Sequence, residues 1–397
     1  MATPFTGEGE RRKGSVELRA LAARRLRPVA DRGAPGKVNR PLLATLGELG
    51  LLSRVVPLAG PVRAQDLCLL RESLAYACTA AETALALQGL GAHPVVAHGT
   101  RAQRARWLPE VAAGRAVAAF ALSEPGAGSD AAALELRAEP TGARGAIRAG
   151  GADGAAVSGW RLHGEKRWIS NAPQADVYTV FARTGPGTRA AGVTAFLVPA
   201  DRPGLGGEPL EMLGPHPVGT LTFDGVPVGP GDVVGEVGRG FRLAMATLDL
   251  FRPSVGAFAV GMARSALDAS VAHAGERRAF GGPLKDLQAV SHLLAEMATR
   301  TEAAALLVQA AAAAYDAGEP GVAARSAMAK LFATETAQYV VDSAVQIHGA
   351  RALAHGHLLE HLYREVRAPR IYEGASEVQR TIIAKELFRA AGAGASP

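Results

Sequence analysis

The chain has 397 residues, of which 48% are hydrophobic and 20% are charged. This length exceeds one ordinary hydrophobic core and this composition excludes a disordered protein, so we expect two or three packed subdomains. The formal net charge of +6 comes without a Lys/Arg block that contains interleaved aromatic residues, which favours scattered, solvated arginines over a nucleic-acid groove.

Residues 1–118 are expected to form an N-terminal helical domain. The charged segment 8–13 lacks the apolar core of a secretory signal, and no apolar run approaches the ~20 residues of a membrane span. Cys68 and Cys78 lie ten positions apart in an apolar stretch, which fits reduced, buried thiols and a cytoplasmic protein. Apolar residues at three- and four-residue spacing predict the following helices: 16–31, 41–51, 66–78, 80–97 and 101–113.

Residues 119–232 are expected to form a small central β domain, either a barrel or a sheet. Short runs of β-branched and aromatic residues predict strands over 177–181, 193–198 and 221–223. Gly, Pro and Asp separate these runs, as in the turn-like pair Asp224-Gly225.

Residues 233–397 are expected to form a C-terminal four-helix bundle. Alanine-rich segments with an apolar stripe predict helices over 253–274, 286–317, 320–348 and 376–391. Ser376 and Gln379 have capping-box spacing, so a helix should begin just after Glu373 and leave Glu373 in a loop. The fold class is therefore mainly α with a β domain.

Three stretches contain groups that are able to hold a ligand. Residues 120–130 (FALSEPGAGSD) combine close-approach glycines with hydroxyl groups, although an ordinary Pro-Gly turn has the same spacing. Residues 166–171 (KRWISN) place a tryptophan near a hydroxyl, although a strand with its aromatic side chain in the core also fits. Residues 276–283 (ERRAFGGP) place arginine before a break, where it is able to bind a pyrophosphate, but many helix ends look similar.

Together with residues 346–349 (QIHG) and 371–374 (IYEG), these stretches resemble the acyl-CoA dehydrogenase family. The motifs follow the family order and spacing over about residues 15–390. The resemblance implies an FAD-dependent enzyme that converts an acyl-CoA to a trans-2-enoyl-CoA. In that reaction Glu373 would remove the α-proton, and hydride would pass to flavin N5.

The resemblance also implies roles for individual residues. Trp168 would cover the flavin edge, Ser170 would bond near N5, and Arg277 would hold the adenosine half of FAD across a subunit interface. The implied cofactor-binding residues are Phe120, Leu122, Ser123, Gly128, Ser129, Trp168, Ile169, Ser170, Arg277, Phe280, Gln288, Gln346, Gly349, Ala350, Ala375, Ser376 and Glu377. The implied substrate-binding residues are Ser129, Asp249, Phe251, Arg252, Tyr372 and Gly374.

Some family branches carry the base beside the position of Arg252, but Phe251 stands there, which favours Glu373. Phe251 either fills part of the acyl pocket or is simply core. Ala350, Ala352 and Ala375 depart from the family pattern, which puts FAD affinity in question. The histidines at 348, 355, 357 and 361 do not share one helical face, so no metal is expected.

The implied partners are an acyl-CoA or acyl-carrier-protein substrate, an electron-transfer flavoprotein as electron acceptor, and further copies of the chain in a homodimer or homotetramer. One alternative is a dehydrogenase or oxidase that acts on a carrier-bound acyl group in a biosynthetic pathway. Another is a non-catalytic, DNA-associated relative, supported by the basic charge alone. Nucleic acid and membrane partners are not expected.

Overall fold

The structure is a computed structural model that describes residues 8–141, 147–148, 156–185 and 189–393. The chain divides into two compact units. Unit 1 comprises residues 1–27, 63–82 and 249–397, and unit 2 comprises residues 28–62 and 83–248. The boundaries fall within helices α2, α6 and α8 and in the segment directly before α5. The three-domain division at 118/119 and 232/233 stays a prediction.

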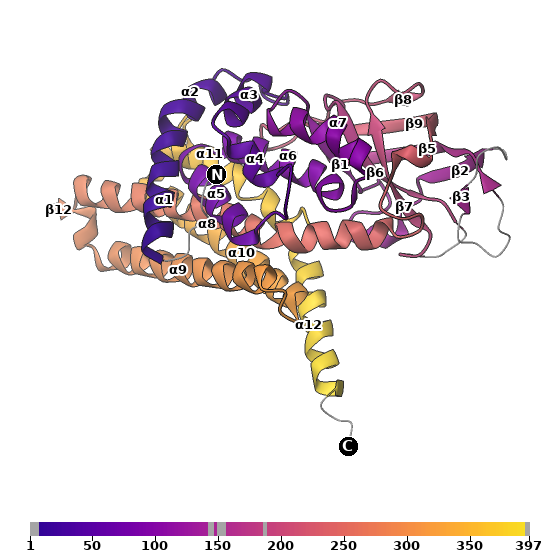
Figure 1. Cartoon of the computed structure of the whole chain (residues 1–397). Helices are drawn as coiled ribbons and strands as arrows, with labels where there is room; N and C mark the ends of the chain where they lie inside the picture. The colour runs from indigo at the N-terminus through magenta and orange to yellow at the C-terminus, as the bar shows by residue number, and fades with distance from the viewer. Residues whose placement is uncertain (1–7, 142–146, 149–155, 186–188, 394–397) are drawn as a thin grey trace. The chain divides into compact units, whose positions relative to one another are not determined.

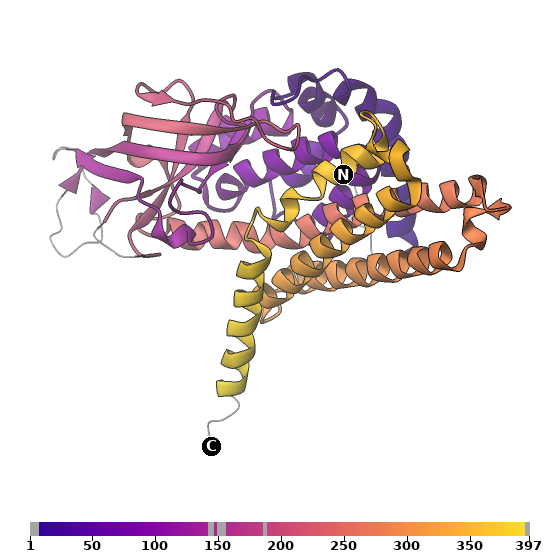
Figure 2. The ribbon, with the colours of Figure 1, turned by 180° about the vertical axis from the view of Figure 1, so that it is seen from behind.

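Unit 1 is built mainly from long helices, and α9 and α10 lie side by side in both views (Figures 1 and 2). A short hairpin joins α8 to α9. The elements are α1 (Glu8–Leu21), the π-helical turn η1 (Ala22–Leu26), α5 (Ala64–Ala77), α8 (Gly240–Glu276), β11 (Arg278–Ala279), β12 (Gly282–Pro283), η4 (Leu284–Asp286), α9 (Gln288–Asp316), α10 (Val322–His348), η5 (Gly349–Leu353), α11 (Leu358–Glu365), η6 (Ala368–Arg370) and α12 (Ser376–Ala393).

Small residues let the helices of unit 1 approach closely. A Cβ on Gly256 of α8 would lie 2.7 Å from a Val308 methyl group on α9 and 3.2 Å from the Ala329 carbonyl oxygen on α10. Buried alanines such as Ala312 and Ala333 line the same interior. The alanine-rich composition thus becomes a tightly packed helical core.

Unit 2 contains a mixed sheet and shorter helices. Eight of its described strands form one sheet in the order β10-β7-β6-β2-β5-β9-β8, with β1 paired in parallel to β6, and β3 and β4 pair with each other separately. The elements are α2 (Arg27–Ala30), α3 (Arg40–Glu48), α4 (Leu51–Val55), α6 (Thr79–His98), α7 (Arg101–Ala112), β1 (Ala118–Ala121), η2 (Ala131–Ala133), β2 (Arg137–Thr141), β3 (Ile147–Arg148), β4 (Ala156–Val157), β5 (Gly159–Ser170), β6 (Val177–Arg183), β7 (Val193–Pro199), β8 (Leu205–Gly206), β9 (Val218–Val228), η3 (Pro230–Asp232) and β10 (Val233–Val234).

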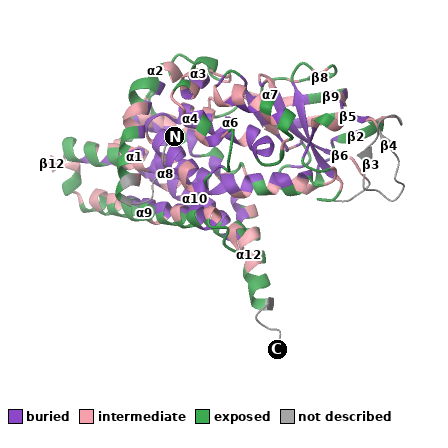
Figure 3. Ribbon diagram, in the orientation of Figure 1, coloured by how far each residue is buried: buried purple, intermediate pink, exposed green. Residues whose placement is uncertain are grey.

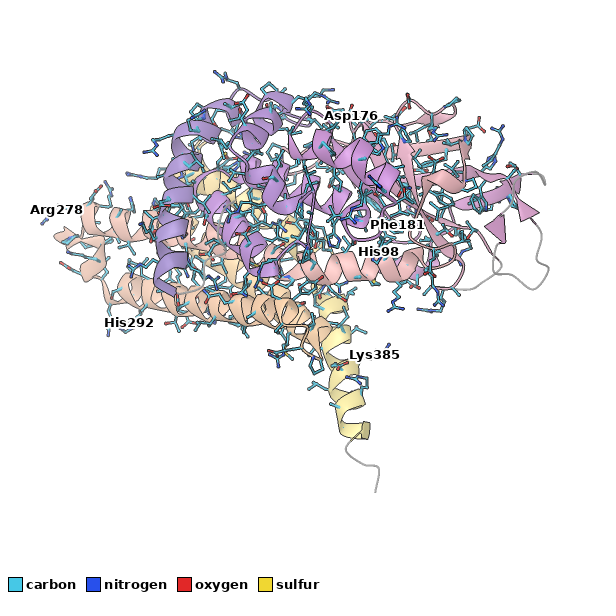
Figure 4. All side chains as sticks on the ribbon, in the orientation of Figure 1. His98, Asp176, Phe181, Arg278, His292 and Lys385 are labelled. Carbon is cyan, nitrogen blue, oxygen red and sulfur yellow. The ribbon has the colours of Figure 1, made fainter. Side chains whose placement is uncertain are left out.

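The centre of this sheet is apolar on both faces. All seven residues of β7 are buried, and six of the seven in β6, which appear purple in Figure 3. The rings of Phe181 and Phe120 pack with centroids 4.9 Å apart. Asp176, labelled with Phe181 in Figure 4, accepts a 2.7 Å hydrogen bond from Val117 N and so aligns the start of β1 with β6.

The expected fold class is confirmed, and the other long helices and central strands lie close to their predicted bounds, but α8 begins at Gly240 instead of 253 and β9 spans Val218–Val228 instead of 221–223. Helix α11 was not predicted. The capping-box prediction is right about the start of α12 but wrong about the contacts. Ser376 bonds Glu335, and Gln379 bonds the carbonyl groups of Glu373 and Gly374.

Helix α8 differs from the expectation that no segment has the length and apolarity of a membrane span. Its 37 residues include an 18-residue window that meets both criteria, but 83% of that window is buried inside the protein. A core helix of a soluble protein passes the same test. Cys68 and Cys78 are free and buried, as predicted.

Candidate active site

Glu373 lies in the 370–376 loop of unit 1, between η6 and α12. Its backbone is left-handed, with a φ of 52°, and Gly374 follows with a φ of 95°. Such a conformation is uncommon for a residue with a side chain and often marks a functional site. A Cβ on Gly374 would come within 2.5 Å of Gln379 Nε2, so the turn requires glycine at this position.

Three buried side chains donate hydrogen bonds to the two carbonyl oxygens of this turn. Lys330 Nζ, on α10, lies 2.7 Å from Gly374 O. Gln379 Nε2, on α12, lies 3.1 Å from Glu373 O and 2.8 Å from Gly374 O. Arg252 Nε, on α8, lies 3.3 Å from Glu373 O. Three helices therefore fix the backbone that carries Glu373.

The ends of the 370–376 loop are also bonded to α10. Glu335 accepts a 2.6 Å hydrogen bond from Ser376 Oγ and forms a 2.8 Å ion pair with Arg370. Burial on its own would raise the pKa of Glu335, but the bonds from Ser376 and Arg370 lower it overall. Glu335 thus remains a carboxylate that holds both ends of the loop.

The Glu373 carboxylate, unlike its backbone carbonyl group, keeps one oxygen without a hydrogen bond from any described residue. Its Oε2 atom is buried and has no hydrogen-bond partner in the part of the chain that the structure describes. Burial raises the pKa of Glu373, and the charges of Arg71, Lys330 and Arg252 partly offset this effect. A carboxyl group with a raised pKa and an unshared oxygen is suited to take up a proton near neutral pH.

Arg71, on α5, is fixed by buried partners. Its guanidinium forms an ion pair with Glu82 and donates a 2.8 Å hydrogen bond to Ser254 Oγ on α8. Burial is the largest single effect and opposes the charge on Arg71, but Glu82, Tyr372 and Glu373 together outweigh burial and raise the pKa of Arg71. Arg71 therefore stays a cation, and its charge acts on both Tyr372 and Glu373.

The predicted substrate residues of α8 lie beside this loop within unit 1. Arg252 forms a 2.8 Å ion pair with Asp249 while its Nε bonds the Glu373 carbonyl oxygen. Burial raises the pKa of Asp249, and Arg252 opposes the rise. The Phe251 ring is fully buried, whereas Tyr372 is partly exposed. The structure therefore brings Asp249, Arg252, Glu373 and Gly374 together.

In unit 2, a buried ion pair joins two of the sequence motifs. Lys166 Nζ, from β5, lies 2.7 Å from Glu124 Oε1 and 2.8 Å from Leu122 O. Glu124 also accepts hydrogen bonds from the backbone N–H groups of Glu135 and Leu136. Burial lowers the pKa of Lys166 to about 8, and Glu124 counters this effect. Buried bonds from Lys166 therefore hold the 120–130 segment against β5.

Trp168 lies at a β-bulge in β5. The β5–β9 register shifts between Lys166 and Ile169, and Trp168 has a φ of 57°. Its indole is 46% exposed, whereas Ile169 points into the core. The bulge thus presents a flat aromatic face on a rigid strand.

The 120–130 segment offers open space to a ligand. A Cβ added to Gly126 or Gly128 would have no atom within 4 Å. Ser129 is exposed and Ser123 is half-buried, whereas the Leu122 side chain is buried. Leu122 and Ile169, both predicted to bind cofactor, therefore have only their backbone groups to offer.

The remaining predicted cofactor residues of unit 1 lie mostly on its surface. Phe280, at the tip of the β11–β12 hairpin beside the labelled Arg278 in Figure 4, is 92% exposed and has a φ of 52°. Arg277, Gln288, Gln346, Gly349 and Ala350 are also exposed. Ala352 is fully buried, so its methyl group points into the protein and away from any ligand at this surface.

Three histidines, on α8, at the end of α10 and directly before α11, pack with one another. His348 stacks on His273 with ring centroids 4.2 Å apart and meets His357 at 5.7 Å. Burial lowers the pKa values of His273 and His348, which favours neutral rings. In residues 8–393, outside the undescribed gaps, no group of three His, Cys, Asp or Glu side chains is arranged to hold a metal.

Sequence reasoning missed the residues that support the loop. Lys330, Arg71, Glu82 and Glu335 were not predicted, and Lys166 and Glu124 were seen only as members of motifs. A signal exists for Lys330 and Arg71, because each is an ionisable residue within an apolar stretch of a helix: Ala329-Lys330-Leu331 and Leu69-Leu70-Arg71. A charge among apolar neighbours, when it is buried, is almost always paired.

The geometry agrees with comparisons to known proteins. Family models described as the acyl-CoA dehydrogenase N-terminal, middle and C-terminal domains match residues 10–115, 119–226 and 238–388. Cyclohexane-1-carbonyl-CoA dehydrogenase of Geobacter metallireducens is 34% identical over 395 residues, which is 98% of this chain and 100% of that protein.

Two solved structures cover nearly the whole chain. Butyryl-CoA dehydrogenase from Megasphaera elsdenii is 30% identical with a TM-score of 0.85, and the match covers 98% of this chain and 100% of that one. A chain from structural work on the electron transferring flavoprotein of Acidaminococcus fermentans is 30% identical with a TM-score of 0.87 and the same coverage.

Proposed function

Since this chain belongs to the acyl-CoA dehydrogenase family, we propose that Glu373 removes the α-proton of the acyl-CoA that this flavin-dependent oxidoreductase dehydrogenates. The assignment rests on a contrast between the backbone and the side chain of Glu373. Its carbonyl oxygen accepts from Arg252 and Gln379, while its carboxylate Oε2 is covered and unshared. An unshared oxygen on a fixed backbone is what a general base requires.

The backbone of the same residue supports the reaction. The α-proton of a thioester is too weakly acidic for a carboxylate to remove unless the developing enolate oxygen is stabilised. The Glu373 N–H makes no hydrogen bond to another described backbone group, so it is available to donate to the thioester oxygen. Such preorganised donors contribute several kcal/mol, on the order of 3 kcal/mol each.

We propose FAD as the flavin. In unit 2, the exposed Trp168 indole, the half-buried Ser170 and the open space at Gly128 suit an isoalloxazine ring and a pyrophosphate. In unit 1, the exposed Arg277 and Phe280 suit the adenosine half of a cofactor. The other proposed contacts are Phe120, Leu122, Ser123, Ser129, Ile169, Gln288, Gln346, Gly349, Ala350, Ala375, Ser376 and Glu377. When bound, the flavin accepts the β-hydrogen as hydride.

Arg252 and Asp249 are proposed to contact the pantetheine part of the substrate, with Ser129, Tyr372, Gly374 and Phe251 beside it. Arg252 is fixed on both sides by Asp249 and the Glu373 carbonyl group. Acyl-CoA is the proposed substrate, and relatives that carry short and cyclic acyl names support testing these first. An acyl group on a carrier protein stays the alternative.

An electron-transfer flavoprotein is the proposed electron acceptor, supported by the structural similarity to the chain from the Acidaminococcus fermentans work. A homodimer or homotetramer is proposed from exposed apolar side chains of unit 1, such as Phe280 and Phe388. The buried free thiols of Cys68 and Cys78 support a reducing, cytoplasmic location.

The test is anaerobic reduction of the purified yellow protein with short, branched, cyclic, aromatic and carrier-bound acyl thioesters, followed by flavin bleaching. Glu373→Gln should bind flavin and thioester but reduce the flavin at least ~1000-fold more slowly, because the amide cannot accept the α-proton. Glu48→Gln, at an exposed position on α3, is the matched control. Reduction of Glu373→Gln at the native rate would show that another group is the base.

A further inference from the structure

Helix α10 holds the 370–376 loop through two ionic side chains that lie five residues apart. Glu335 bonds both ends of the loop through Arg370 and Ser376. Lys330 bonds its middle at the Gly374 carbonyl oxygen, 2.7 Å from Nζ. One rigid helix thus contacts the loop on either side of Glu373 and directly after it.

Lys330 occupies a buried position where the charge of a lysine is unfavourable because it is desolvated. The residue is fully buried, and buried alanines at 327, 329 and 333 lie on the same helix. Burial lowers the pKa of Lys330 to about 8. A methionine would fill a similar volume in an apolar core without the desolvation cost of an ammonium group. The charge therefore calls for an explanation other than packing.

The charged groups around Lys330 and Glu373 come from each helix that packs on the loop. Lys330 is acted on by Glu373, Arg252, Glu335 and Glu377. Glu373 is acted on by Arg71 from α5, Arg252 from α8 and Lys330 from α10. Of these cations, Arg71 is neutralised by Glu82 and Arg252 by Asp249. Lys330 has no ion pair within 4 Å among the described residues, so its charge is the least compensated.

The Lys330 ammonium donates a hydrogen bond to the Gly374 carbonyl oxygen and none to the Glu373 carboxylate. A direct bond to the Glu373 carboxylate would favour the ionised form so strongly that the group would be a poor base. A bond to the next carbonyl oxygen supplies positive charge nearby while Oε2 stays unshared. The same bond restrains Gly374 in its left-handed conformation.

We propose that Lys330 is a positioning residue for the Glu373 base: anchored on the Gly374 carbonyl, it holds the left-handed Glu373–Gly374 turn and favours the ionised carboxylate while one carboxylate oxygen stays free of hydrogen bonds. This inference rests on the proposed role of Glu373. It adds a residue that touches neither substrate nor flavin and acts through the backbone of the base. Lys330 thereby affects both the geometry of the turn and the ionisation of the Glu373 side chain.

The test compares Lys330→Met with Lys330→Gln in the flavin-loaded enzyme. The rate constant of anaerobic flavin reduction by saturating acyl-CoA is measured from pH 5 to 9, together with flavin absorbance and Tm. Lys330→Met removes the charge and the donor, so the plateau rate should fall about 10- to 100-fold. Its acid limb should also move to higher pH by about one unit, because the carboxylate loses a nearby cation.

Lys330→Gln removes the charge but keeps an N–H donor, so it should show the same shift of the acid limb with a smaller loss of plateau rate. Lys385→Met, at an exposed position labelled on α12 in Figure 4, is the control and should match the native enzyme. An unshifted acid limb in the Lys330 variants overturns the proposal, as does an equal shift in Lys385→Met. If Lys330→Met does not fold, Lys330→Gln decides the question.

The two proposals fail in different ways. An active Glu373→Gln enzyme overturns the assignment of the base, whatever the Lys330 variants do. An inactive Glu373→Gln enzyme with native pH profiles for both Lys330 variants overturns only the role of Lys330.

Discussion

At the scale of single residues, the ionisation of Glu373 is set by two opposing effects. Burial favours the neutral acid, whereas Arg71, Lys330 and Arg252 favour the carboxylate, and burial prevails because the pKa of Glu373 is raised. The folded protein therefore binds this proton more tightly than the unfolded chain does. Stability contributed by this group is present at low pH and is lost as the pH rises above the unfolded pKa of about 4.3.

Glu373→Gln should therefore raise the stability of the protein at pH 8, because the neutral amide removes the buried charge. The gain in Tm should shrink as the pH falls toward 4.5, because the raised pKa makes the native carboxyl group increasingly protonated. Calorimetry of the two proteins from pH 4.5 to 8 measures the difference, with Glu48→Gln as the exposed control. A Tm for Glu373→Gln that is lower than the native value at pH 8 would contradict the raised pKa. Gains of this kind are expected where a site trades stability for activity.

At the scale of elements, buried ion pairs connect segments that are distant in the sequence. Lys166 of β5 and Glu124 of the 120–130 segment are both buried and form such a pair in unit 2. The Arg167 backbone N–H also donates to Ser123 O at 3.0 Å. These bonds set the position of Ser123 relative to Trp168, the two side chains proposed to contact the flavin.

Lys166→Met should lower the free energy of unfolding by about 3–5 kcal/mol, because it leaves the Glu124 carboxylate buried without its cation. Lys166→Met combined with Glu124→Gln should recover part of that loss, because the amide still accepts the backbone bonds without a charge. Urea unfolding gives both values, and the flavin content of the purified variants reports on the 120–130 segment. The interpretation fails if the double variant is less stable than both single variants.

Local patterns predicted the elements, but not the polar contacts between them. Spacing of apolar residues located α9 and α10 because each buries one stripe of a long helix. Helix α11 has only eight residues, too few for a clear period. Lys330 was missed because a lysine is expected in solvent, and its partner, the carbonyl group of Gly374, lies 44 residues away.

The site shows the same limit. Glu373 was identified by its resemblance to a family motif, and its position in a loop before a helix was predicted correctly. Its left-handed backbone and the bonds from Arg252, Lys330 and Gln379 depend on three helices meeting at one turn. No spacing within a single segment specifies such a meeting.

At the scale of the whole molecule, unit 1 leaves several large apolar side chains in solvent. Phe280 is 92% exposed, Phe388 is 78% exposed and Leu387 is 62% exposed. The C-terminal part of α12, which carries the last two, extends beyond α9 and α10 in both views and appears exposed in Figure 3. Isolated exposed apolar residues are ordinary, but adjacent ones at the end of a helix favour a contact with another chain.

We therefore expect the chain to assemble with itself, so that light scattering gives a mass that is two or four times 40.8 kDa. Leu387→Glu combined with Phe388→Glu should reduce the mass to that of a smaller species, because an apolar interface does not accommodate two unpaired carboxylates. Lys385→Glu changes a charge at an exposed site on the same helix and serves as the control. A monomeric native protein contradicts the expected assembly. A native mass that persists in the double variant places the contact elsewhere on unit 1, with the exposed Phe280 hairpin as the next surface to alter.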